Sequence, residues 1–146
     1  MNKQNRFLPT TKEEMKQRGW DELDVVLITG DAYIDSPFMG IAVVGRILED
    51  IGLRVGIIGQ PDINSDVDIK RLGEPKLFWG VSGGSIDSMV SNYTATKKFR
   101  NDDDYTPGGK NNKRPDRATL VYTNLIRRYF KNTAPIVLGG IEASLR

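Results

Sequence analysis

The chain has 146 residues, of which 38% are hydrophobic and 27% charged, and this mixture is typical of one soluble globular domain with a sizeable core. Its formal net charge is only +2, which favours neither a nucleic-acid partner nor a membrane surface. Cysteine and histidine are both absent, so the polypeptide supplies no disulfide, thiolate nucleophile, cysteine-ligated metal cluster or imidazole base.

The first segments predict a tail and a short helix. We expect residues 1–6 to form a mobile tail. The stretch TTKEEMKQRGW then has the pattern of a helix that Thr10 or Thr11 caps and Gly19 ends. No apolar run approaches the roughly 20 residues of a membrane span, and the polar N-terminus is not a secretory signal. We therefore expect a cytoplasmic protein.

Residues 24–59 have the pattern of a strand–helix–strand unit. The apolar runs 24–29 and 53–59 are too short for helices and are rich in Val, Ile and Leu, as in strands that are buried on both faces. Between them, Ser36 is the candidate N-cap of a helix with Pro37 at its first position. Two strands joined through a helix run parallel, with a right-handed crossover. The apolar stripe that this helix is expected to turn toward the sheet consists of Ile41, Val44, Ile47, Leu48 and Ile51.

A weak helix at 66–72 and a third strand at 77–81 are predicted next, with Phe78 and Trp79 pointing to opposite faces. Ser85 is then the candidate cap of a helix whose apolar side is Ile86, Met89, Val90 and Tyr93.

The stretch 94–115 is a long polar loop, which is typical of either a functional or a disordered segment. The basic residues that gather in it are candidates for contact with an anionic ligand or partner, and they are Lys97, Lys98, Arg100, Lys110, Lys113 and Arg114.

The last part of the chain predicts one more helix and one more strand. Asp116 is a good N-cap, and the apolar positions of the helix that follows are Leu120, Val121, Leu125, Ile126 and Tyr129. The fourth strand pattern is 136–138, and a further helix begins behind it. The four short strands with their connecting helices predict an α/β fold, an open parallel sheet of about four strands with helices on both faces.

Each of the four strand patterns ends in glycine, at Gly30, Gly59, Gly83–Gly84 and Gly139–Gly140. In an open parallel sheet the carboxyl ends of the strands share one edge, where helix N-termini and exposed backbone amides bind ligands. Glycine after a strand is also what a tight turn into a helix needs. The pattern therefore agrees equally with a binding edge and with a set of tight turns.

No phosphate-binding fingerprint accompanies these glycines. The sequence contains no G-x-x-x-x-G-K-S/T, and no strand is followed by a complete G-x-G-x-x-G, so a dinucleotide enzyme of the usual kind is disfavoured. Carboxylates at this edge are potential metal ligands or acid–base groups, but no spacing demands such a role and a solvated or capping role is favoured. These carboxylates are Asp31, Asp35, Asp62, Asp87 and Glu142. We expect no metal ligand and no catalytic residue in this chain.

Four stretches are long and specific enough to compare with known families: ITGDAYIDSPFMGIAVVGRILEDIGLRVGIIGQPD, FWGVSGGSIDSMVSNYTATKK, RPDRATLVYTNLIRR and PIVLGGIEASLR. Together they span nearly the whole chain and closely resemble the N-terminal region of the YgiQ-like family of uncharacterised radical-SAM proteins. Proteins of that family are several times longer. The resemblance implies that a radical-SAM barrel follows, whose C-x-x-x-C-x-x-C motif binds a 4Fe–4S cluster and S-adenosylmethionine. Residues 1–146 are then interpreted as one N-terminal accessory domain that ends before the barrel.

The resemblance also implies a Rossmann-like fold of the flavodoxin or cobalamin-binding type, which precedes many radical-SAM barrels. A chain without histidine cannot contain the D-x-H-x-x-G loop, so histidine ligation of cobalt is excluded, while binding of cobalamin by other contacts stays open. An iron–sulfur cluster needs three thiolates, which this chain lacks. We expect no cofactor in this polypeptide itself.

The residues shared by the resemblance and by the edge geometry are the candidate cofactor-binding residues Gly30, Asp31, Asp35, Ser36, Ser82, Gly83, Gly84, Ser85, Gly139, Gly140 and Glu142. The favoured interpretation is an accessory domain whose glycine edge and residues 97–117 face the mouth of the barrel of the same longer chain, beside an unknown small-molecule substrate. One alternative is a self-contained binding module for a nucleotide or a corrinoid. Another is a packing or interaction domain, whose signature would be exposed apolar residues such as Met39, Ile141 and Leu145.

Overall fold

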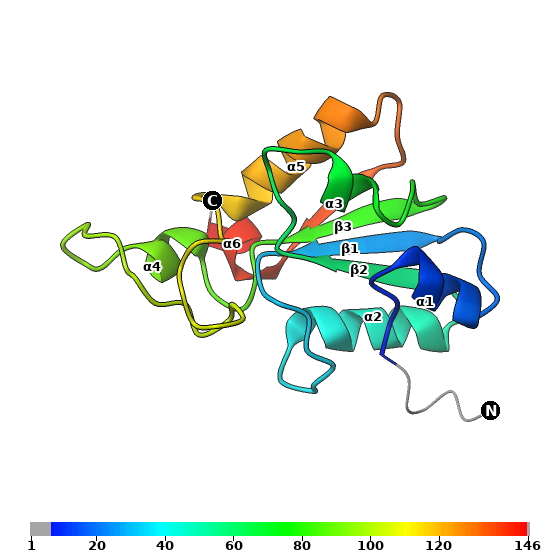
Figure 1. Ribbon diagram of the computed structural model, residues 1–146, viewed down its shortest axis with the longest axis horizontal. Helices are drawn as coiled ribbons and strands as arrows, with labels where there is room; N and C mark the ends of the chain where they lie inside the picture. Colours follow the sequence, from blue (N-terminus) through cyan, green and yellow to red (C-terminus); the bar gives the residue numbers. More distant parts are fainter. Residues whose placement is uncertain (1–6, 146) are drawn as a thin grey trace.

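The structure is a computed structural model that describes residues 7–145, so the tail predicted at residues 1–6 lies outside the described part. Its centre is a four-stranded sheet in which every neighbouring pair is parallel, in the order β2-β1-β3-β4 (Figure 1). The strands are β1 (Val25–Thr29), β2 (Val55–Gly59), β3 (Phe78–Ser82) and β4 (Ile136–Gly139). The α/β fold with an open parallel sheet is confirmed.

Helices cover both faces of the sheet. Figure 1 shows α2 along one face and α3 and α5 along the other, while α4 and α6 lie near the end where the strands finish. The helices are α1 (Lys12–Gln17), α2 (Gly40–Asp50), α3 (Val67–Lys70), α4 (Ser88–Asn92), α5 (Ala118–Tyr129) and α6 (Gly140–Leu145). Trp79 belongs to the apolar cluster beside α5, and Phe78 packs on the cluster beside α2. Their opposite orientation is as predicted.

The first helix begins where the sequence predicts. The hydroxyl of Thr11 accepts a hydrogen bond from the N–H of Glu14 at 3.2 Å, which makes Thr11 the N-cap of α1. The side chain of Met15 is buried and packs α1 against the core. The chain then reverses at Gly19, whose φ is +74°, a value that glycine adopts without strain.

The helix predicted to start at Ser36 and Pro37 begins at Gly40 instead, with Met39 as its N-cap. Ser36 closes a turn of its own, because its hydroxyl accepts the N–H of Phe38 at 3.2 Å and its carbonyl accepts the N–H of Met39 at 3.1 Å. That turn occupies the groups that a helix cap would need. Met39 is only 8% exposed, so the expectation that it is an exposed apolar residue is wrong.

The face of α2 that meets the sheet is not the bulky stripe that the sequence predicts. Ala42 and Gly45 are the buried residues of this helix, and a Cβ at Gly45 would overlap Leu8 Cδ1. Because α2 approaches the sheet through its smallest side chains, only Ile41 and Leu48 of the predicted stripe pack on the core. The other three, Val44, Ile47 and Ile51, are exposed.

The cap and the inward face of α4 also differ from prediction. The carboxylate of Asp87 accepts the N–H of Val90 at 3.3 Å, so Asp87 rather than Ser85 is the N-cap. The inward side is polar and consists of Ser88, Ser91 and Asn92, whereas Val90 is 58% exposed. Tertiary hydrogen bonds, described below, hold this helix in an orientation that its apolar pattern does not indicate.

Helix α5 follows Arg117, which has a left-handed φ of +51°, and Asp116 is not its N-cap. The carboxylate of Asp116 instead accepts hydrogen bonds from the amide of Asn92 at 2.8 Å and from the hydroxyl of Tyr93 at 2.7 Å. The predicted inward residue Leu120 is 56% exposed. The buried residues of α5 are Ala118, Thr119, Tyr122, Leu125 and Ile126.

Residues 94–115, which we call the polar loop, contain no helix or strand. Two antiparallel bridges, Tyr93 with Phe99 and Asp102 with Lys110, fold this stretch into successive turns at the end of the molecule where the strands finish (Figure 1). Of the basic residues grouped there by sequence, Arg114 is buried and the others are exposed.

Candidate functional site

The carboxyl ends of the four strands meet along one edge of the sheet, which we call the rim. The register pairs Thr29 with Gly59 on one side and with Ser82 on the other, and Ser82 with Gly139. Since the strands are parallel, the loops that leave them start side by side. The rim brings together most of the candidate residues, namely Gly30, Asp31, Ser82, Gly83, Gly84, Ser85, Gly139, Gly140 and Glu142.

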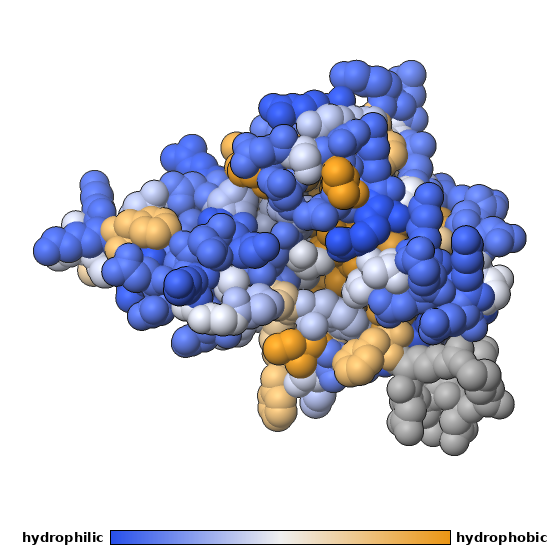
Figure 2. Space-filling view, in the orientation of Figure 1, coloured by the Kyte–Doolittle hydropathy of each residue, from blue (hydrophilic) through white to orange (hydrophobic). Residues whose placement is uncertain are grey.

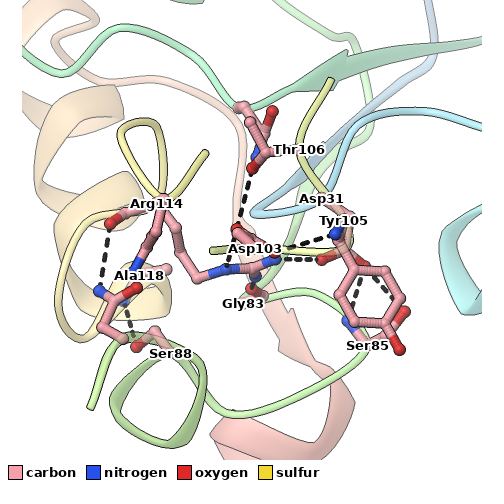
Figure 3. A network of polar contacts seen from close by, with 12 residues as sticks. Asp31, Gly83, Ser85, Ser88, Asp103, Tyr105, Thr106, Arg114 and Ala118 are labelled. Carbon is pink, nitrogen blue, oxygen red and sulfur yellow. Dashed lines mark hydrogen bonds and ion pairs between the residues drawn. The ribbon is translucent and has the colours of Figure 1, made fainter. Parts of the chain in front are cut away.

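Asp31, just after β1, lies at the centre of a buried polar network (Figure 3). Its Oδ2 accepts hydrogen bonds from the N–H and the hydroxyl of Ser85, at 2.7 and 2.8 Å, and its Oδ1 accepts one from Nη2 of Arg114 at 2.6 Å. Nη1 of Arg114 donates to the carbonyl of Gly83 at 2.7 Å. The side chains of Asp31 and Arg114 are 2% and 0% exposed, so they form a buried ion pair.

Arg114 also anchors the polar loop to this network. Its Nε donates to Oδ2 of Asp103 at 3.3 Å, and Asp103 also accepts the N–H of Tyr105 and the hydroxyl of Thr106, both at 2.9 Å (Figure 3). Thr106 in turn accepts a hydrogen bond from the amide of Gln60 at 2.6 Å. A single guanidinium therefore joins the ends of β1 and β3 to the polar loop.

The electrostatics of the network favour the charged forms of Arg114 and Asp103. Burial alone disfavours the charge of Arg114, but the carboxylates of Asp31 and Asp103 outweigh it and raise the pKa of the guanidinium. Burial likewise acts to raise the pKa of Asp103, yet the Tyr105 N–H, the Thr106 hydroxyl and the charge of Arg114 together hold that pKa below its usual value. One cation thus lies between two carboxylates inside the protein.

Glu142, in α6, is a second buried carboxylate, with 2% of its surface exposed. It accepts hydrogen bonds from the N–H and the hydroxyl of Ser88 and from the N–H and the hydroxyl of Thr119, the latter two at 2.8 and 2.6 Å. Ser88 and Thr119 lie in the first turns of α4 and α5, so one carboxylate compensates two helix N-termini. Burial opposes its charge, but these four donors hold the pKa of Glu142 below its usual value.

The rim leaves no room for side chains at Gly83 and Gly84. A Cβ at Gly83 would overlap the carboxylate of Glu142, and one at Gly84 would overlap the carboxylate of Asp31. Gly84 also has a φ of +114°, which strains any other residue. Gly139 differs, because a Cβ there would meet nothing within 4 Å.

The lowered pKa values of the buried carboxyl groups Asp103 and Glu142 predict a loss of stability in acid. Asp103 and Glu142 have a lower pKa in the folded than in the unfolded chain, so as the pH falls the unfolded state binds protons first. The stabilisation is present above about pH 4 and disappears progressively below it. We expect the urea midpoint to be level between pH 7 and 5 and to drop below about pH 4. A midpoint that stays level down to about pH 2 would contradict this expectation.

Two candidate residues, Asp35 and Ser36, have their partners in α2 and in the turn before it. Asp35 forms an ion pair with Arg46, whose Nε donates to Oδ1 at 3.2 Å, and Arg46 also pairs with Glu49 at 3.0 Å. Ser36 closes the turn that precedes α2. These residues fasten the loop after β1 to the helix rather than joining the Asp31 network.

An open trough runs from the rim along β1, β3 and β4, on the side of α2, with a volume of about 420 Å³. Its walls are mainly the apolar residues Phe38, Ile41, Val44, Phe78, Val137 and Ile141. At the rim end it is bordered by the hydroxyl-bearing Ser82 and Ser85 and by the uncrowded Gly139. Figure 2 shows apolar side chains projecting from the lower side, over the turn before α2, where Phe38 is 93% exposed.

This arrangement has the chemistry of a largely apolar binding surface with a polar end. Asp31 and Glu142 direct their carboxylate oxygens at internal donors, and Ser82 and Ser85 are the hydroxyl-bearing residues that border the trough at the rim. Sequence reasoning missed Asp103, and it named Arg114 only as one of six basic residues that could contact an anionic ligand or partner. The one usable signal was the acidic run 102–104 within a mainly basic loop, and it does not say which members pair.

The described residues do not fit an iron–sulfur cluster. Within residues 7–145 there is no group of three or more side chains able to hold a metal ion, and the whole chain lacks cysteine. No helix in the described part of the chain is both long and apolar enough to cross a membrane.

Comparison with known proteins identifies the class to which this α/β domain belongs. Residues 7–146 match the family described as Radical SAM N-terminal, and the chain belongs to that family. This confirms the family predicted from the sequence motifs. None of the solved structures matches the chain.

The similar curated proteins carry the name UPF0313 protein. The chain is 64% identical over 140 residues to the one from Thermotoga petrophila, covering 96% of this chain and 24% of that protein. It is 63% identical to one from Fusobacterium nucleatum, over 97% of this chain and 25% of the relative, and 56% identical to one from Pseudomonas aeruginosa, over 96% and 19%. The chain therefore spans about a quarter or less of the length of these relatives.

Proposed function

We propose that this chain is an accessory domain of a longer radical-SAM iron–sulfur enzyme and that it shapes one side of the substrate pocket without catalysing a reaction itself. One observation carries this proposal: the chain belongs to the Radical SAM N-terminal family, yet it has no cysteine that could hold a cluster. The 4Fe–4S cluster and S-adenosylmethionine would belong to the rest of the longer chain. The reaction and its substrate would be set there as well.

The face that we assign to the catalytic part is the rim with the adjoining trough. Ser82, Ser85 and Gly139 border the trough at the rim, where a hydroxyl or a backbone group can contact a substrate. The Asp31–Arg114 ion pair and the Glu142 contacts support that surface from behind, because they fix the loops after β1 and β3. Their role is to position this surface.

A specific observation also supports a second candidate, a small-molecule binding module. The trough has a volume of about 420 Å³, within the range of ligand pockets, and its mostly apolar walls end in a few polar groups. A corrinoid or a nucleotide is the ligand class to test, although a corrinoid would bind without a histidine ligand from this chain. A titration followed by backbone chemical shifts decides: changes at Ser85 and Gly139 with hydroxocobalamin or ATP support this candidate, and unchanged spectra remove it.

The accessory role is tested in the full-length protein that contains this chain. After anaerobic reconstitution we expect it to bind iron and sulfide and to cleave S-adenosylmethionine reductively to 5′-deoxyadenosine, whereas the isolated chain does neither. A full-length protein that binds no iron and forms no 5′-deoxyadenosine would overturn the assignment to a radical enzyme.

A substitution at the rim tests whether this face of the domain lies beside the reaction site. Gly139→Leu places a side chain in open space beside the trough, so the fold tolerates it. We expect unchanged iron content and roughly tenfold slower formation of 5′-deoxyadenosine, because misplacing a bound substrate slows its reaction steeply. Ala95→Leu, in an exposed turn of the polar loop, is the matched control. Equal rates for the two variants would show that the rim does not face the reaction site.

A further inference from the structure

The two edges of the sheet are finished differently. On the outer side of β2, the N–H of Ile57 donates to the carbonyl of Pro9 at 2.9 Å, so the stretch before α1 covers that edge. On the other side, β4 is the last strand, and among residues 7–145 no further strand pairs with it. An uncovered edge strand offers a row of unpaired N–H and C=O groups to another strand.

The outward-facing backbone groups of β4 follow from its pairing with β3. The N–H of Trp79 donates to the carbonyl of Pro135 at 2.8 Å, and Trp79 lies opposite Ile136. In a parallel ladder the residue opposite such a donor directs its own N–H and C=O away from the partner strand. Ile136 and, two residues on, Leu138 therefore present their backbone groups to the open side.

The side chains of β4 are apolar, as in a strand at the centre of a sheet, but they are as exposed as those of an edge strand. Its sequence is Ile-Val-Leu-Gly, and Val137 and Leu138 are 52% and 50% exposed on opposite faces. All five residues of β1, by contrast, are buried. Parallel strands are normally covered on both faces, so β4 lacks a neighbouring strand on its outer side and covering layers over Val137 and Leu138.

A groove with three leucines in its lining lies beside Leu138, on the face of α5. Leu138 of β4, Leu120 of α5 and Leu145 of α6 line it, its volume is about 500 Å³, and these three side chains are each at least half exposed. We call it the leucine groove. The rest of its lining is Arg117, Thr119, Thr123, Glu142 and Ala143.

The topology indicates what would fill this groove. α6 leaves β4 directly, as a crossover helix does, and connections between parallel strands are right-handed in nearly all cases. Since α5 crosses over from β3 to β4, a right-handed crossover from β4 to a strand beyond it places its helix on the same face as α5. That is the face of the leucine groove, and the resulting strand order would be the doubly wound 2-1-3-4-5.

We propose that the open edge of β4 and the leucine groove receive the polypeptide that follows residue 146 in the longer proteins of this family. The relative from Thermotoga petrophila is about four times as long as this chain, which covers 24% of it, so the required residues exist. The helix begun by α6 continues across the leucine groove, and the next segment pairs with β4 as a fifth parallel strand. This inference goes beyond the proposed function, because it holds whichever reaction the longer chain catalyses.

Amide hydrogen exchange in the full-length protein tests the proposal without any measurement of activity. We expect the amides of Ile136 and Leu138 to exchange roughly 100-fold more slowly than that of Gly108, at an exposed loop tip, and to resemble the bonded amide of Ile57. Exchange at the rate of Gly108 would overturn the proposal. Protection that disappears on dilution would identify a second copy as the occupant and would overturn it too.

A pair of leucine substitutions provides a second measurement. Leu138 and Leu77 are equally exposed here, at 50%, but Leu77 precedes β3 and lies outside the groove. In the full-length protein we expect Leu138→Ser to speed proteolysis of the native state roughly 100-fold, as loss of a buried leucine does, and Leu77→Ser to change it little. If Leu138→Ser speeds proteolysis as little as Leu77→Ser does, nothing covers Leu138.

Discussion

Replacing Arg114 with alanine is expected to lower the free energy of unfolding by about 3–5 kcal/mol, because the substitution leaves two buried carboxylates without their cation. The guanidinium contacts Asp31, Asp103 and the carbonyl of Gly83, and its side chain is fully buried. Breaking one side of a buried ion pair costs far more than removing an exposed one, which is worth about 0–1 kcal/mol. Urea unfolding of the chain measures the difference.

Two further variants separate the network from a general effect of charge. Lys113→Ala removes a positive charge from the adjacent, exposed position, and we expect a change within about 0.5 kcal/mol. Arg114→Lys keeps the charge but cannot reproduce the planar fork that reaches three acceptors, so its stability should lie between the other two. If Arg114→Ala is no more damaging than Lys113→Ala, the buried network does not hold the polar loop.

The second large effect is expected at Glu142. Glu142→Ala leaves the N–H and hydroxyl groups of Ser88 and Thr119 without an acceptor in the interior. Hydrogen bonds to a charged group contribute about 1.5–3 kcal/mol each and are not additive, so we expect a loss of about 3 kcal/mol or more in the free energy of unfolding.

The matched controls for Glu142 are an isosteric change and a remote one. Glu142→Gln keeps the size but supplies one acceptor oxygen in place of two, and we expect an intermediate loss together with a weaker decline of stability in acid. Glu74→Ala removes an exposed carboxylate and should change stability by less than about 0.5 kcal/mol. Equal stabilities of the Glu142 and Glu74 variants would contradict the role given to the buried carboxylate.

The fold was largely predictable because each strand is a short, continuous apolar run that ends in glycine. Such runs identify strands of a parallel sheet without any knowledge of their partners, and the right-handed crossover rule then limits the topologies. Thr11 was predictable as a cap for a similar reason, since its partner Glu14 is only three residues away. These features depend on local sequence, where periodicity and turn chemistry are informative.

The site was much less predictable because its contacts join residues far apart in the sequence. Arg114 and Asp31 are separated by 83 residues, and nothing in the basic run distinguishes Arg114 from its exposed neighbours. The predictions of Ser85 and Asp116 as N-caps were wrong for the same reason. Both side chains are suited to capping, but they bind partners elsewhere in the fold. The predicted inward face of α2 was also partly wrong, because this helix packs most closely on the core at Gly45 and not through its stripe of bulky residues.

The position of Glu142 determines the order in which the polar contacts of the rim form during translation. Ser88 precedes Glu142 by 54 residues and Thr119 precedes it by 23, so both helix starts leave the ribosome before the acceptor that they share. A nascent chain that ends ahead of this glutamate therefore has uncompensated amides where α4 and α5 begin. Arrival of α6 is then the step that completes these polar contacts at the rim.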